Sequence, residues 1–214
     1  TQQGEPPSPA PQPDDPEDTP AGSSIRKNGL QSELSGCALF RDGQMVGELT
    51  GRQTLLLQLG RGSFHQGDIT LRNLENAQPL SLHLVQKSAP DVRFEALLSS
   101  APRAIVTLHL DAAPYEGITP GNQALALYQP GDDALIAEKT VAQLTEGLEE
   151  LEALFRSLKS DLWGLGRFAI RNFSRAADWE AFSWCERFAT LDISWRIELS
   201  VSEPQIEFME RPSY

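Results

Sequence analysis

The sequence predicts an α+β fold, in which a mostly antiparallel β-sheet is covered by one long α-helix and accompanied by short helices. Residues 133–162 repeat apolar side chains at steps of three and four, which is typical of a helix with one apolar face. Several other segments alternate apolar and polar residues, which is typical of half-buried strands. Because a helix stripe and a sheet face both need burial, we expect them to pack on each other.

The long helix has the strongest helical pattern. Asp132 or Asp133 is a candidate N-cap. The apolar stripe consists of Val141, Leu144, Leu148, Leu151, Phe155, Leu158 and Leu162. The mostly outward positions hold Glu138, Glu146, Glu149, Glu150 and Glu152. A coiled coil is the alternative, but about three heptads ending at a Trp-Gly pair are short for one, so packing on the sheet is favoured.

Six segments have strand character. Four candidates are 67–72, 80–86, 92–98 and 104–110, and a short one is 124–128. The clearest strand is 191–201, where six apolar residues alternate with polar ones and Pro204 should end the strand. These alternating patterns favour a mainly antiparallel sheet with one face left for the helix.

The N-terminal part has a different composition. Residues 1–24 contain five acidic residues, no basic residue and seven prolines. Such a segment buries too little apolar surface to offset its ordering entropy, so residues 1–35 are predicted to be a disordered acidic linker and 36–214 the folded domain. The sequence begins at Thr1, and we expect it to be a C-terminal piece of a longer gene product.

A hairpin and a short helix are expected where the folded domain begins. Two short apolar runs flank Asp42-Gly43, a dipeptide suited to a tight turn. Thr50 then suits the N-cap of a helix that ends at Gly60 or Gly62.

Charge and composition exclude several classes of function. The net charge is −12, so phosphate backbones and anionic lipid should be repelled, and no nucleic-acid partner is expected. No apolar run is long enough to span a membrane, so any anchor should lie upstream. Cys37 and Cys185 are compatible with a disulfide or with two free thiols.

Signatures of catalysis are missing from the sequence. There is no G-x-S-x-G, no phosphate-binding loop and no H-E-x-x-H, so we predict no enzymatic activity, no catalytic residue and no cofactor. His83 and His109 lie on two predicted strands and would need a carboxylate to bind a metal. Solitary histidines on a polar sheet face are the favoured interpretation, so no metal site is predicted.

Aromatic residues gather after the long helix. Trp163, Trp179, Trp184 and Phe188 suit the wall of a small-molecule pocket. They also suit a plug that closes the end of the sheet beneath the helix, and this interpretation is favoured. A domain that binds an amino acid or a sugar is therefore the alternative function.

Three motifs together resemble one protein family. Residues 37–47 (CALFRDGQMVG) resemble the G-x-A-hydrophobic-F-K-D-x-K-hydrophobic-V-G opening of the C-terminal domain in the Ger(x)C family, the C subunits of spore germinant receptors. Residues 161–166 (DLWGLG) are similar to the family's D-[IP]-F-G-[FL]-G after a long helix. Trp179, Trp184 and Phe188 match its W-x(4)-W-x(3)-F segment.

The resemblance implies a function that composition did not reveal. It implies a lipoprotein on the outer surface of the inner spore membrane, held by an upstream lipid anchor that this sequence lacks. It also implies action with membrane-embedded A and B subunits in nutrient-triggered spore germination, without catalysis. We expect the helix break to be an exposed turn that meets a partner. The candidate interaction motif is Asp161, Trp163, Gly164, Gly166, Trp179 and Trp184.

Overall fold

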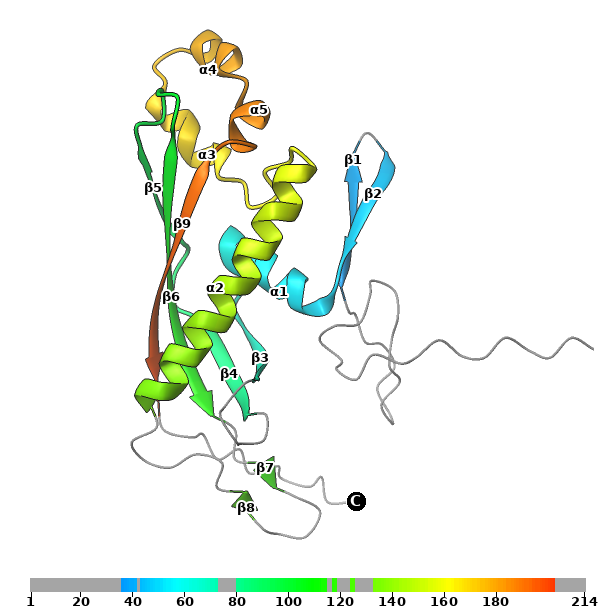
Figure 1. Cartoon of the computed structure of the whole chain (residues 1–214), viewed down its shortest axis with the longest axis vertical. Helices are drawn as coiled ribbons and strands as arrows, with labels where there is room; N and C mark the ends of the chain where they lie inside the picture. The colour runs from blue at the N-terminus through cyan, green and yellow to red at the C-terminus, as the bar shows by residue number, and fades with distance from the viewer. Residues whose placement is uncertain are drawn as a thin grey trace, which may run out of the picture. The chain divides into compact units, whose positions relative to one another are not determined.

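The computed structural model describes residues 36–41, 43–72, 80–114, 117–118, 124–125 and 133–202 (Figure 1). The chain divides into two compact units, Thr1–Leu55 and Leu56–Tyr214, which are described separately. The predicted linker at 1–35 lies outside the described residues, as do Asp42, Asp132 and residues 126–128 of the predicted strand.

The first unit contains the predicted hairpin. Strand β1 (Cys37–Arg41) pairs antiparallel with β2 (Gln44–Leu49), and a bulge shifts the register between Leu39 and Phe40. Gly43 has φ +78°, the conformation that a tight turn requires and that glycine adopts without strain.

Helix α1 (Gly51–Arg61) begins in the first unit with a capping box. The Gln53 N–H donates to Thr50 Oγ1 (3.3 Å), and the Thr50 N–H donates to Gln53 Oε1 (3.0 Å). In the second unit the helix ends at Arg61, and of the two predicted glycines Gly62 terminates it, because Gly62 adopts φ +76° and donates to the Leu59 carbonyl oxygen.

Strand β6 is the centre of the main sheet in the second unit. The antiparallel strands β4 and β5 pair with different parts of one edge of β6, and the parallel strand β9 pairs with its other edge. β3 lies beyond β4. The strands are β3 (Gln66–Leu71), β4 (Leu80–Gln86), β5 (Asp91–Glu95), β6 (Arg103–Pro114) and β9 (Asp192–Val201). The predicted α+β class with a mostly antiparallel sheet is confirmed.

One sheet face is buried under α2 (Asp133–Ser157), the predicted long helix. On this face every second residue of β6 is almost completely buried: Ala104, Val106, Leu108, Leu110 and Ala112. Parallel register places Ile193 beside Ala104 and Ile197 beside Leu108, so β9 extends the same apolar face. The expected packing of the helix on the sheet is therefore confirmed (Figure 1).

Helix α2 ends at Ser157, so the predicted end at residue 162 is wrong. Lys159 adopts φ +46°, its N–H donates to the Arg156 oxygen (2.9 Å), and the Ser160 N–H donates to the Phe155 oxygen (3.0 Å). These two bonds form a Schellman cap on a non-glycine residue, which the sequence pattern did not reveal. Leu158 and Leu162 consequently lie beyond the helix.

Strand β5 ends three residues earlier than predicted. Ala96 has φ +49°, which starts a turn over residues 96–101 instead of continuing the strand to residue 98. The short predicted strand is represented by β8 (Ala124–Leu125), which pairs with β7 (Gly117–Ile118).

Short helices follow α2 and gather at one end of the main sheet (Figure 1). They are α3 (Gly166–Ala169), the 3₁₀ helix η2 (Ile170–Asn172), α4 (Ala176–Phe182) and α5 (Trp184–Phe188). α4 and α5 are separated by Ser183, which adopts φ +53°. None of the helices in the described ranges is long and apolar enough to cross a membrane.

Candidate functional site

The Asp161 carboxylate joins three parts of the aromatic end of the sheet. Its Oδ1 accepts the Leu165 N–H (2.9 Å), and its Oδ2 accepts the Gly166 N–H (2.6 Å). Oδ2 also accepts the indole N–H of Trp184 (2.9 Å). One half-buried side chain therefore connects the turn after α2, the start of α3 and helix α5.

The two glycines of the motif are required for different structural reasons. Gly164 adopts φ +75°, and its N–H donates to the Asp161 oxygen (3.2 Å), which closes a turn. A Cβ atom on Gly166 would lie 2.7 Å from Nε1 of Trp184, so this position has no space for a side chain. The D-x-W-G-x-G spacing thus builds a junction that accepts the Trp184 ring.

Trp163 is a core residue, so the expectation that this turn is exposed is wrong for its tryptophan. Its side chain is 0% exposed and lies between Phe155 and Trp195, with ring centroids 4.6 and 4.8 Å away. A Cβ on Gly60 of α1 would come within 2.5 Å of the same ring. A direct partner contact by Trp163 would require this core to open.

A second aromatic group covers the end of the sheet. Trp179 and Trp184 are nearly parallel with centroids 5.8 Å apart, and Phe182 lies 6.4 Å from Trp184. Phe94 of β5 meets Trp184 edge-on at 6.0 Å. These separations are those of rings in direct contact. The three tryptophans of the ligand hypothesis therefore do not surround a common space, since Trp163 packs in a separate group.

The histidines do not meet. His83 Nδ1 lies 2.8 Å from Asp68 Oδ1, and His109 Nδ1 lies 3.0 Å from Glu198 Oε2. His83 is opposite Ala113, which is four residues from His109, or roughly 13 Å along the strand. In the described part of the chain no three His, Cys, Asp or Glu side chains are placed to hold a metal ion. Both cysteines are free.

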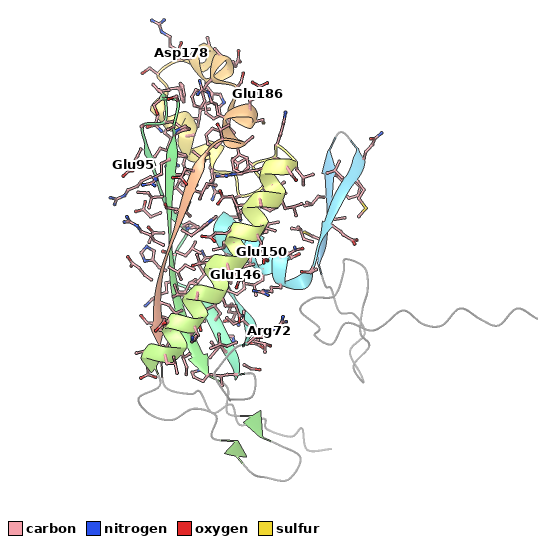
Figure 2. The ribbon with its side chains drawn as sticks, viewed as in Figure 1. Arg72, Glu95, Glu146, Glu150, Asp178 and Glu186 are labelled. Carbon is pink, nitrogen blue, oxygen red and sulfur yellow. The ribbon has the colours of Figure 1, made fainter. Side chains whose placement is uncertain are left out.

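Glu152 is buried, contrary to its predicted outward position. It is only 7% exposed and forms an ion pair with Arg156, whose guanidinium also donates to the Leu191 carbonyl just before β9. Burial raises the pKa of Glu152, and the charge of Arg156 opposes this rise. The other predicted outward glutamates are exposed, among them Glu146 and Glu150 (Figure 2).

Sequence reasoning missed three exposed arginines that follow the motif closely in the sequence: Arg167, Arg171 and Arg175. The guanidinium carbons of Arg167 and Arg171 lie 4.7 and 5.3 Å from the centre of the Phe168 ring. All three arginines are exposed, and none forms an ion pair with any residue whose position is described. The signal was present in the sequence, because residues 162–177 contain three arginines and no acid in a chain of charge −12.

Asp161→Ala should destabilise the protein. The change removes the acceptor of three hydrogen bonds, one of them from an indole, and we expect a loss of about 2–4 kcal/mol in the free energy of unfolding. Denaturant unfolding followed by tryptophan fluorescence measures this loss. Asp178→Ala, at an exposed position in the first turn of α4, is the control and should cost less than about 1 kcal/mol. Equal small losses would contradict the role of Asp161.

Glu152 should make stability depend on pH. Because its folded pKa is raised, its favourable contribution is complete below the unfolded pKa of about 4.3 and is lost as pH rises through the folded pKa. Wild type should therefore lose stability relative to Glu152→Gln between pH 4 and pH 7. Unfolding curves across this range test the sign, with Glu150→Gln as the exposed control. The opposite slope would mean that the Arg156 ion pair outweighs burial.

Comparisons with known proteins identify a matching family and a similar fold. A family model described as "Spore germination B3/ GerAC like, C-terminal" matches residues 35–205. A solved structure titled "Crystal Structure of the GerBC protein" has a TM-score of 0.63 and 13% sequence identity, which indicates a shared fold. The match covers 79% of this chain and 51% of that one, so this chain spans about half the length of that structure.

No curated protein matches the sequence. The family model nevertheless covers most of the 214 residues, including all three motifs that resemble the Ger(x)C family and the whole main sheet. The chain therefore belongs to the spore germination B3/GerAC-like family and corresponds to its C-terminal domain.

Proposed function

We propose that this chain is the C-terminal domain of a spore germinant receptor C subunit that acts in nutrient-triggered germination through protein contacts, without catalysis. The match of the family model over residues 35–205 carries this proposal. The structural roles of the motif residues support it, because Asp161, Gly164 and Gly166 build the junction between α2 and the short helices.

The partners follow from the same assignment. We place the domain at the outer surface of the inner spore membrane, beside the A and B membrane subunits of the receptor. The lipid anchor belongs to a part of the longer polypeptide upstream of this chain. The charge of −12 disfavours nucleic acid as a partner.

We infer that the candidate interaction motif holds the neighbouring exposed surface in position. Trp163 is buried, and the Asp161 carboxylate accepts hydrogen bonds from groups within the fold. The exposed residues next to the motif include Ile170, which is 42% exposed, and Arg171 and Arg175, which form no ion pair with a described residue. Guanidinium groups without a carboxylate partner suit an acidic protein segment, so this surface is our candidate for the contact with the A or B subunit.

Deletion of the gene in spores of the source organism tests the proposal. We expect loss of dipicolinic acid release after nutrients, with a normal response to dodecylamine, which acts independently of receptors. Because related receptors can substitute for one another, the deletion is also made in a strain without paralogues. Normal nutrient responses in that strain would contradict the assignment to a germinant receptor.

Complementation then distinguishes the positioning role of the motif from a direct partner contact by the neighbouring surface. Ile170→Ser with Arg171→Glu changes exposed side chains, so the variant should fold with wild-type stability yet fail to restore the nutrient response. Gln58→Glu, an exposed change on α1, is the control and should restore it. Full rescue by the double variant would remove this surface as the contact site while leaving the family assignment unaffected.

A further inference from the structure

Strand β9 is an outer strand, because β6 occupies one of its edges and no strand in the described part of the chain pairs with the other. The Asp192 N–H donates to the Pro102 oxygen (3.1 Å), and the Ser202 N–H donates to the Ala112 oxygen (2.9 Å). Because backbone groups alternate in direction along a strand, the even-numbered residues of β9 face β6. The odd-numbered residues direct their N–H and C=O groups outward: Ile193, Trp195, Ile197, Leu199 and Val201.

The outer strands β3 and β9 differ in how their free edges are protected. At the β3 edge, Gln143 of α2 donates to the Thr70 oxygen (2.9 Å) and accepts the Arg72 N–H (3.0 Å), as a neighbouring strand would. Across the described ranges, no group occupies the outward backbone of residues 193–201. β9 also lacks proline, glycine and any bulge in its ten-residue ladder, the features that usually keep an outer strand from pairing.

The side chains of β9 are also incompletely covered. On the face under α2, Leu108 and Leu110 of β6 are 0% exposed, whereas their neighbours Ile197 and Leu199 on β9 are half-buried. A further strand beside β9 would cover this apolar surface and satisfy its outward backbone groups together.

We propose that β9 pairs antiparallel with β9 of a second copy of this chain, about a two-fold axis at Ile197. In this register Ile197 lies opposite Ile197 of the second copy, and Trp195 lies opposite Leu199. All these residues direct their backbone groups outward, so they form the hydrogen-bonded pairs of an antiparallel ladder. The same register places apolar side chains together on the face under α2.

The charges of Arg196 and Glu198 favour this register over registers shifted by two residues. Arg196 lies opposite Glu198 of the second copy, and Glu198 lies opposite Arg196, in the non-hydrogen-bonded pairs where side chains approach most closely. Both side chains are exposed. A shift of two residues in either direction places Arg196 opposite Arg196 or Glu198 opposite Glu198, and both arrangements are repulsive. The sequence of β9 is therefore complementary to itself, which favours a second copy over a strand from another protein.

Sedimentation equilibrium of the full 214-residue chain tests the pairing. We expect a concentration-dependent dimer. Arg196→Glu and Glu198→Arg should each weaken it about tenfold, because each change creates two like-charge pairs. The double variant Arg196→Glu with Glu198→Arg recreates complementary pairs and should restore wild-type affinity.

A backbone variant tests the edge itself. The Ile197 N–H points away from β6, so Ile197→Pro removes an outward donor without removing a bond of the β6 ladder, and the dimer should be lost. Two controls should retain the dimer: Arg93→Glu, an exposed charge reversal on β5, and His109→Gln, which replaces the imidazole that contacts Glu198 without changing the charge of β9. Circular dichroism checks that each variant is folded.

Three results would overturn the proposal. They are a monomer at every concentration up to the solubility limit, a dimer that is insensitive to the Arg196 and Ile197 changes, and failure of the double charge reversal to restore dimerisation. A monomeric protein whose Ile197→Pro variant loses the nutrient response would instead assign the open edge to a different subunit. None of these results bears on the family assignment.

Discussion

The Asp161 carboxylate is the interaction on which the helical end of this domain depends. Its two oxygens accept the N–H groups of Leu165 and Gly166 and the indole of Trp184. Because Trp184 also contacts Phe94 and Trp179, the carboxylate fixes an aromatic layer that closes the end of the sheet. Asp161, a residue of the candidate interaction motif, therefore has a structural role within the fold.

A second constraint comes from the connection between β6 and β9. Helix α2 carries the chain back along the sheet, so β9 enters parallel to β6 although the other pairings of this sheet are antiparallel. Arg156, which forms an ion pair with the buried Glu152, donates to the Leu191 carbonyl oxygen just before β9 begins. Among the described residues, the same chain path leaves the far edge of β9 without a paired strand, which is why the proposed pairing with a second copy uses this strand.

Sequence periodicity predicted the α+β class, the hairpin, both main helices and the principal strands, because these depend on local patterns of apolar residues. It failed where the backbone conformation of one residue determines where a helix or strand ends. Lys159 and Ala96 both adopt positive φ and end their elements early, and neither residue type signals this. Burial of Glu152 also escaped prediction, since it depends on contacts near the start of β9 that are distant in sequence. The burial of Trp163 agrees with the favoured interpretation of an aromatic plug beneath the helix. The parallel direction of β9 has no local signature.

Hydrogen exchange measured by mass spectrometry tests the central claim, that Asp161 holds the short helices against the sheet. In Asp161→Ala, peptides from residues 166–188 should lose protection while peptides from β6 keep theirs, because only the helical end depends on the carboxylate. Unchanged protection over residues 166–188, or an equal loss in β6, would contradict the account.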